Sequence, residues 1–186
     1  MREKDAVPTS KTPPIPCIFY PWFKDHAKLM IYFHGIGEDL HVIQREIQFI
    51  RDMLMINVLA VEYPGYGVNW NDGICSEERM RSDARQVLKF ILEETDLEMK
   101  HIILLGRSMG SAVAAAVAAE FQRYSAALIV CLSPFYSLKE LARQHAGACG
   151  AHLLANKFNS GENFTKVNQA TPVLLVHGTV DTLVPV

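Results

Sequence analysis

The sequence predicts an α/β fold, in which a mostly parallel β-sheet is covered by helices on both faces. Short runs that are apolar at every position alternate along the chain with longer segments whose apolar residues recur every three or four positions. Fully apolar strands are typical of sheets buried on both faces, and their alternation with helices is typical of parallel sheets. The chain has 186 residues, of which 49% are hydrophobic and 20% charged, so one domain with a substantial core is expected.

The expected strands occupy residues 29–33, 58–61, 102–105, 127–132 and 173–176. Helices are expected at 40–54, with Glu38 and Asp39 in the first turn, from the N-cap Ser76 to Ile91, and at about 109–121. Right-handed crossovers bring the carboxyl ends of parallel strands to one edge, so the residues that follow these strands are expected to meet there. Residues 134–166 carry weaker helical signals and are interpreted as a lid-like excursion over that edge.

Residues 1–16 are rich in proline and are expected to form a flexible lead-in to the folded domain, which spans 17–186. The N-terminus is not apolar enough for a secretory leader, and no apolar run reaches the roughly 18–20 residues needed to cross a bilayer. The four cysteines are widely spaced, which favours a reducing, cytoplasmic location over a disulfide scaffold. Acylation of Cys17 would allow peripheral membrane association, and this alternative stays open.

The most informative motif is Gly106-Arg107-Ser108-Met109-Gly110, which directly follows the apolar run at 102–105. A G-x-S-x-G sequence between a strand and a helix is the pattern of a nucleophile elbow, a tight turn that presents a serine hydroxyl above the sheet. A side chain in place of Gly106 or Gly110 would crowd this turn. Ser108 is therefore the predicted nucleophile, and Arg107 is expected to pack or pair locally and not to react.

A serine hydroxyl needs a base, an acid that orients the base, and hydrogen-bond donors for the oxyanion that forms in the reaction. The loop His34-Gly35-Ile36-Gly37 follows the first apolar strand, where one such donor is expected. We predict the backbone N–H of Ile36 as this donor, because the glycines on both sides leave it free to turn inward. The N–H of Met109, next to the nucleophile, is the predicted second donor. His34 is interpreted as a residue that shapes the loop.

The acid is predicted in the polar segment His177-Gly178-Thr179-Val180-Asp181, which follows the last apolar strand. Because the expected chain order is serine, then acid, then histidine, Asp181 fits the acid. His177 is interpreted as another residue that shapes the backbone of a loop.

In these motifs the chain resembles the α/β-hydrolase superfamily, over residues from about 17 to the end. The matching segments are 34–35, 62–67, 106–110, 133–134 and 177–185. The closest resemblance is to the eukaryotic α/β-hydrolase-domain-containing branch, which includes protein depalmitoylases and serine-aminopeptidase-like hydrolases. The resemblance implies a hydrolase domain with a catalytic set made of Ser108, Asp181 and a histidine.

The expected histidine is missing from the chain. The family places it after one further strand beyond the acid, whereas all seven histidines precede Asp181. The final strand and helix of the family are also missing, so the sequence is interpreted as a hydrolase domain truncated at its C-terminus, with 173–176 as an unprotected edge. A lid arrangement that brings His145 or His152 to the site is the alternative.

The favoured function is hydrolysis of a carboxylic ester or thioester through an acyl-enzyme on Ser108, with a small molecule or an acylated protein as substrate. The first alternative is a serine-aminopeptidase-like peptidase, in which Glu38 would pair with the substrate ammonium. The second is a non-catalytic binding protein of the same fold. No cofactor or metal is expected, because the sequence has no phosphate-binding loop or metal-ligand spacing. The net charge of −2 does not favour nucleic acid as a partner.

Overall fold

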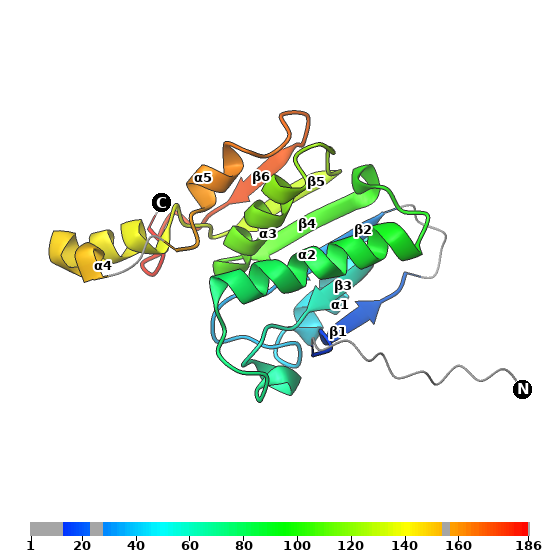
Figure 1. Cartoon of the computed structure of the whole chain (residues 1–186), viewed down its shortest axis with the longest axis horizontal. Helices are drawn as coiled ribbons and strands as arrows, with labels where there is room; N and C mark the ends of the chain where they lie inside the picture. Colours follow the sequence, from blue (N-terminus) through cyan, green and yellow to red (C-terminus); the bar gives the residue numbers. More distant parts are fainter. Residues whose placement is uncertain (1–12, 23–27, 154–156, 186) are drawn as a thin grey trace, which may run out of the picture.

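The computed structural model describes residues 13–22, 28–153 and 157–185, with side chains for all of these but 148–153. In this part of the chain, six strands form one sheet in the order β1-β3-β2-β4-β5-β6 (Figure 1). The strands are β1 (Cys17–Tyr20), β2 (Leu29–Phe33), β3 (Asn57–Val61), β4 (Ile102–Arg107), β5 (Leu128–Leu132) and β6 (Val173–Val176). The predicted α/β fold is confirmed.

All strands except β1 run parallel to their neighbours. Strand β1 is antiparallel to β3, with Cys17 opposite Val61 and Tyr20 opposite Val58. The sequence analysis did not predict β1, an apolar run of only four residues that follows the proline-rich lead-in and pairs with a strand some forty residues further on. The expected strands are all present, and β4 extends through Gly106 to Arg107.

Helices cover both faces of the sheet (Figure 1). Helix α1 (Gln44–Leu54) packs on one face, whereas α2 (Glu77–Glu94) and α3 (Met109–Glu120) pack on the other. The remaining helices are α4 (Leu138–Leu153), α5 (Ser160–Phe164) and the short 3-10 turns Gly67–Asn69 and Met99–His101.

The two faces of the sheet form two apolar clusters, and β2 contributes to both. Ile31 and Phe33 pack toward α2 and α3, while Met30 and Tyr32 pack toward α1. Successive side chains of a strand point to opposite faces, so a strand buried on both sides must be apolar at every position. This requirement explains the continuous apolar runs in the sequence.

Helix α2 begins as predicted, with the Ser76 hydroxyl accepting a hydrogen bond from the Arg79 N–H at 3.2 Å. Helix α1 begins at Gln44, four residues later than the apolar pattern suggested. Residues 40–43 instead form turns, and the Asp39 carboxylate before them accepts a hydrogen bond from the Val42 N–H. The expectation that Glu38 and Asp39 lie in the first helical turn is therefore wrong, and Glu38 has a different role described below.

The predicted lid-like segment contains two helices separated by residues 154–156, which lie outside the described residues. Helix α4 projects away from the sheet (Figure 1) and is kinked at Gly147. Helix α5 packs against α3. The lid role stays a prediction. So does the flexible lead-in, of which residues 1–12 lie outside the described part and 13–16 contain no helix or strand.

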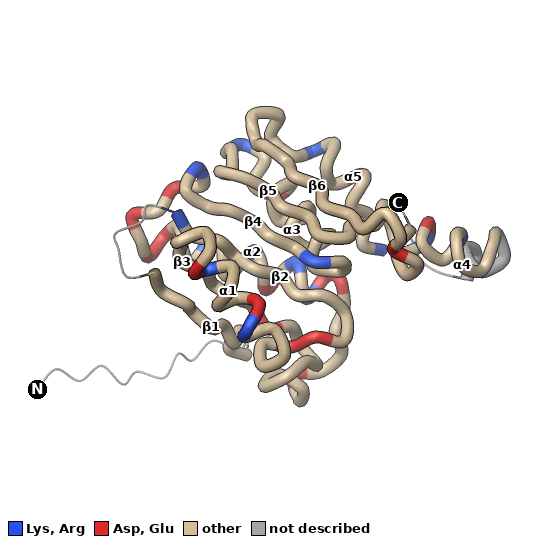
Figure 2. Tube along the Cα trace, turned by 180° about the vertical axis from the view of Figure 1, so that it is seen from behind, with Lys and Arg blue, Asp and Glu red and all other residues tan. Residues whose placement is uncertain are grey.

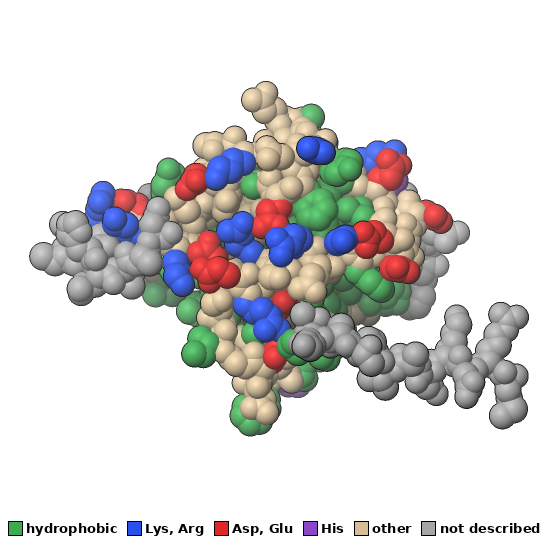
Figure 3. All heavy atoms as spheres, in the orientation of Figure 1, with side chains coloured by type: hydrophobic (Ala, Val, Ile, Leu, Met, Phe, Trp, Pro, Cys, Tyr) green, Lys and Arg blue, Asp and Glu red, His purple; other side chains and the backbone are tan. Residues whose placement is uncertain are grey.

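Charged side chains of both signs are interspersed along the described chain (Figure 2). On the face covered by α2, basic and acidic groups alternate (Figure 3), as in the pair of Arg81 and Glu120 at 2.8 Å. Among the described residues, no helix combines the length and hydrophobicity needed to cross a bilayer.

Candidate active site

Ser108 lies in a strained turn between β4 and α3. Its backbone has φ 49° and ψ −115°, a region that residues with a side chain rarely adopt. A Cβ on Gly106 would collide with the carbonyl group of Gly110, and a Cβ on Gly110 would collide with the Phe33 carbonyl oxygen. The two glycines therefore let the helix approach the strands closely enough to hold the turn. The structure confirms the predicted strand–turn–helix geometry.

The turn is tied to the neighbouring strand, because the Ser108 N–H donates to the Leu132 carbonyl at 2.8 Å. The Ser111 hydroxyl, buried one turn into α3, donates to the Gly106 carbonyl at 2.8 Å. The Ser108 side chain is half-buried and forms no hydrogen bond with any described residue. Its hydroxyl is therefore available to a partner at the carboxyl edge of the sheet.

The segment 34–40, which we call the oxyanion loop, follows β2 directly beside the elbow. Ile36 at its tip is 72% exposed, and its backbone N–H donates no hydrogen bond to the described residues. The same holds for the N–H of Met109, the first residue of α3. Both predicted donors are thus free to bind an oxyanion, and both lie at the same edge of adjacent strands.

A buried contact between a histidine and a glutamate supports the base of the oxyanion loop. Nε2 of His34 lies 2.9 Å from Oε1 of Glu62, and their side chains are 0% and 1% exposed. Nδ1 of His34 donates to the Gly35 carbonyl, while the Glu62 carboxylate also accepts from the N–H groups of Leu40 and Tyr63. One carboxylate thus joins both ends of the loop to the end of β3.

His34 shapes the loop as predicted, but the sequence analysis did not identify Glu62. A signal for it was present, because His34 and Glu62 each follow an apolar strand, and those strands are neighbours in the sheet. A tilted stack of the His34 and Tyr63 rings, with centroids 4.1 Å apart, completes this buried group.

Asp181 lies in the segment 177–185, which we call the acid loop, after β6. Its Oδ1 accepts hydrogen bonds from the N–H groups of Val184 at 2.9 Å and Leu183 at 3.0 Å. The hydrogen bond from Val184 is the largest of several effects that hold the pKa of the Asp181 carboxyl below its usual value. The Leu183 N–H, the Ser133 hydroxyl and His177 act in the same direction. The group is therefore a carboxylate near neutral pH, as the acid of a triad must be.

Strand β5 connects the elbow to the acid loop. The Ser133 N–H donates to the Val176 carbonyl at 2.8 Å, next to the bond between Ser108 and Leu132. Ser133 has φ 46°, and its side chain faces Asp181. Because β4, β5 and β6 are adjacent and parallel, the structure brings Ser108 and Asp181 to the same edge of the sheet.

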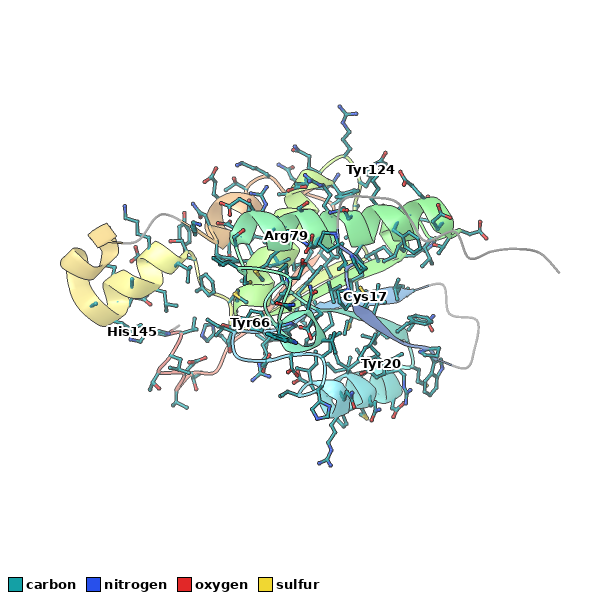
Figure 4. All side chains as sticks on the ribbon, turned by 60° about the horizontal axis from the view of Figure 1, so that its bottom comes forward. Cys17, Tyr20, Tyr66, Arg79, Tyr124 and His145 are labelled. Carbon is teal, nitrogen blue, oxygen red and sulfur yellow. The ribbon has the colours of Figure 1, made fainter. Side chains whose placement is uncertain are left out.

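None of the described histidine side chains forms a hydrogen bond with Ser108. His177 bonds to the Val184 carbonyl at 2.5 Å and lies 3.7 Å from Asp181, so it braces the acid loop as predicted. His145 lies in α4, and its Nε2 is 2.8 Å from the Leu183 carbonyl oxygen. Figure 4 places His145 at one end of the molecule, well away from Tyr66, which lies beside the oxyanion loop. The side chain of His152 lies outside the described residues.

A cavity of about 390 Å³ lies beside the acid loop and is bordered by Phe135, Leu141, Leu175 and Val184. Larger cavities include one of about 510 Å³ beside Asp39, Leu40 and Glu62 of the oxyanion side, and two of about 700 and 650 Å³ that lie along α2. Because ligands of parallel sheets bind at the carboxyl edge, we assign the site by its chemistry and not by cavity size. In the described part of the chain, no group of three or more His, Cys, Asp or Glu residues is arranged to hold a metal ion.

A parallel sheet with a strained serine turn at its carboxyl edge, opposite a glycine-flanked loop, defines the α/β-hydrolase class of folds. The chain belongs to the α/β-hydrolase superfamily, since residues 24–162 match the family model described as serine aminopeptidase, S33. The family and the structural relatives of known activity are hydrolases.

Individual relatives agree with this assignment. An uncharacterized protein of Mycobacterium tuberculosis is 32% identical over 160 residues, which cover 86% of this chain and 48% of the relative. The α/β-hydrolase domain-containing protein 17B of Xenopus tropicalis is 25% identical over 189 residues, covering 98% of this chain and 62% of the relative. The crystal structure of an α/β hydrolase from Vibrio vulnificus superimposes with a TM-score of 0.69 and 25% identity, over 80% of this chain and 56% of that one. The chain thus spans about half the length of the curated relatives it matches.

Proposed function

We propose that the protein is a serine hydrolase that cleaves a carboxylic ester or thioester through an acyl-enzyme on Ser108. The observation that carries this proposal is the geometry of the elbow. Ser108 is held at φ 49°, and within the described part of the chain neither its hydroxyl nor the two neighbouring backbone N–H groups have a hydrogen-bond partner. Maintaining such strain is expected only where the turn has a function.

The reaction would begin when the Ser108 oxygen attacks the carbonyl carbon and its proton passes to a histidine. The N–H groups of Ile36 and Met109 would hold the oxyanion, each lowering the barrier by about 3 kcal/mol. The histidine would then protonate the leaving alcohol or thiol. In the second half of the reaction, water would attack the acyl-enzyme while the histidine takes its proton, and the histidine would return this proton to the Ser108 oxygen as the acid is released. Asp181 would orient this histidine, which we propose is contributed by sequence that follows Val186.

The substrate class we propose is a small acyl ester or an acylated protein. On the face drawn in Figure 3, charges of both signs are interspersed among the described residues, which does not favour an ionic substrate. The cavity beside the acid loop is bordered largely by apolar side chains, which suits an acyl chain.

The description of the matching family model favours a second candidate, a serine aminopeptidase. Such an enzyme needs a free carboxylate for the substrate ammonium, and Glu38 was the predicted candidate. Both oxygens of Glu38 already have partners within the chain, Gly35 and Arg107. We therefore rank the peptidase below the esterase.

The test is a comparison of substrates with protein expressed from its complete reading frame. We expect hydrolysis of p-nitrophenyl esters and acyl thioesters, with little turnover of aminoacyl p-nitroanilides. Ser108→Ala should abolish the reaction, whereas Ser82→Ala, on the outer surface of α2, should leave it unchanged. Preferential cleavage of the anilides would establish the peptidase, and no Ser108-dependent turnover of either class would support a non-catalytic binding protein.

A further inference from the structure

The Glu38 carboxylate connects the oxyanion loop to the nucleophile elbow. Its Oε2 accepts a hydrogen bond from the Gly35 N–H at 2.8 Å, and its Oε1 lies 2.6 Å from Nη1 of Arg107. Arg107 is the last residue of β4 and directly precedes Ser108. The two segments that must hold the reacting atoms are therefore joined by one side chain.

These contacts distinguish the Ile36 N–H from the N–H groups of the glycines on either side of it. Glu38 occupies the N–H of Gly35, and the N–H of Gly37 faces the phenol oxygen of Tyr66. The N–H of Ile36, between them, has no acceptor among the described residues. Of the three N–H groups at residues 35–37, the Ile36 N–H is thus the one left free among the described residues, at the position where the oxyanion is expected.

The Arg107 end of the connection is itself anchored in the fold. Nη1 of Arg107 also lies 3.2 Å from Oε2 of Glu46, in α1. Oε1 of Glu46 accepts a hydrogen bond from the Tyr32 hydroxyl at 3.0 Å, and Tyr32 is fully buried in β2. Arg107 is therefore held from a helix and a strand, so its contact fixes Glu38 relative to the sheet.

We propose that Glu38 and Arg107 are positioning residues, which hold the Ile36 N–H in line with the oxyanion formed on Ser108. This inference rests on the proposed serine-hydrolase function. A displacement of a catalytic group by about 1 Å can cost as much as 10²-fold in rate. The pair would act on the transition state, because a ground-state carbonyl oxygen binds the same donor only weakly.

If Glu38 and Arg107 formed only a surface ion pair, their substitution would leave turnover unchanged, because such pairs contribute little to stability and do not position reacting groups. Arg81 and Glu120 provide a matched control, with side chains 39% and 22% exposed against 44% and 17% for Arg107 and Glu38. This control pair is remote from the site, because Glu120 is the last residue of α3 and Ser108 precedes its first.

The experiment measures kcat and KM for a p-nitrophenyl ester with protein from the complete reading frame. Glu38→Ala should lower kcat roughly 10–100-fold and leave KM within about twofold, because it removes both contacts. Glu38→Gln keeps an acceptor for Gly35 and should lower kcat less, on the order of threefold to tenfold. Arg107→Gln should resemble Glu38→Gln, and Arg107→Lys should recover most of the activity. Glu120→Gln and Arg81→Gln should have no effect.

A readout that does not depend on turnover is the amide NMR spectrum. In Glu38→Ala the Gly35 amide proton should shift upfield and exchange faster, while Glu38→Gln should retain most of its protection. If Glu38→Ala does not fold, Glu38→Gln and Arg107→Gln carry the kinetic test alone.

The two proposals fail in different ways. If the wild type lacks Ser108-dependent turnover, the proposed function is wrong. If turnover depends on Ser108 but the folded Glu38 and Arg107 variants keep kcat within twofold, or change only KM, the positioning role is wrong.

Discussion

The two loops that flank the elbow are held in very different ways. The oxyanion loop is attached to the core by the buried pair of His34 and Glu62 and to the elbow by Glu38. The acid loop follows β6, an edge strand whose four apolar residues are between 43% and 59% exposed. Its contacts with the rest of the chain include the hydrogen bond from His145 and the strand pair of β5 and β6.

This difference shows that the two halves of the candidate site depend on different parts of the fold. The nucleophile and the oxyanion donors are positioned by the interior of the sheet, where neighbouring strands and helices restrict them. The acid is positioned by its own turn, in which two backbone N–H groups hold the carboxylate. Substitutions at the buried base of the oxyanion loop should therefore mainly cost stability, whereas substitution of Asp181 should mainly lower catalysis.

The largest effect is expected on catalysis at the acid loop. Asp181→Asn should lower kcat by about 10⁴-fold, because the amide no longer orients the histidine in its active tautomer. The free energy of unfolding should change little, because the asparagine Oδ1 can still accept from the Val184 and Leu183 N–H groups. Ester hydrolysis and urea denaturation of the same preparation measure both quantities. The control is Asp96→Asn, at the opposite edge of the sheet, and a loss of kcat below tenfold for Asp181→Asn would remove this residue from the mechanism.

The next largest effect is expected on stability at the oxyanion loop. Glu62→Leu should lower the free energy of unfolding by about 3–5 kcal/mol, because it leaves His34 buried without its partner. Glu93→Ala, which removes the exposed contact with Lys89, should cost less than about 1 kcal/mol. Urea denaturation measures both, and equal costs for the two variants would contradict the comparison.

A third prediction compares leucines of the central and edge strands in the 186-residue chain. Leu104→Ala in β4 should cost about 2–5 kcal/mol, because the side chain is fully buried. Leu175→Ala in β6 should cost less than about 1 kcal/mol, because it is 59% exposed. Chemical denaturation with a common m-value tests the difference. A cost for Leu175→Ala as large as that for Leu104→Ala would mean that β6 is covered in solution.

The smallest effect is the titration of Asp181. The Val184 and Leu183 N–H groups favour the carboxylate, so its pKa in the folded protein should lie below the value of about 3.9 for an unstructured aspartate. The stabilisation is complete above the unfolded pKa and is lost as the pH falls through the folded pKa. Carboxyl ¹³C NMR measures the midpoint, which should lie below that of the exposed Asp96. A midpoint at or above the Asp96 value would show that the turn does not hold the carboxylate.

The sequence was sufficient for the parts of the fold that have a local pattern. Apolar strands, the Ser76 cap and the elbow glycines are all encoded within a few residues, and each was found where predicted. Strand β1 was missed because it depends on pairing with β3. The start of α1 was placed too early, because Leu40 and Ile43 are buried although they lie in the turns that precede the helix.

The site shows the same division. Ser108 and Asp181 were proposed from motifs, and both lie at the expected edge of the sheet. The contact between Glu38 and Arg107 joins residues that are 69 positions apart in the sequence. Glu38 lies in a segment whose pattern predicted a helix, whereas the structure shows a loop there. Such a contact is set by the packing of β2 against β4, and no local pattern contains it.

The most direct test of the account is covalent labelling of Ser108. Protein expressed from its complete reading frame would be treated with a fluorophosphonate, and the adduct would be located by intact mass and peptide mapping. We predict one adduct per chain, on Ser108, which disappears in Ser108→Ala. An unlabelled protein, or an adduct on another serine such as Ser133, would contradict the assignment of Ser108 as the nucleophile.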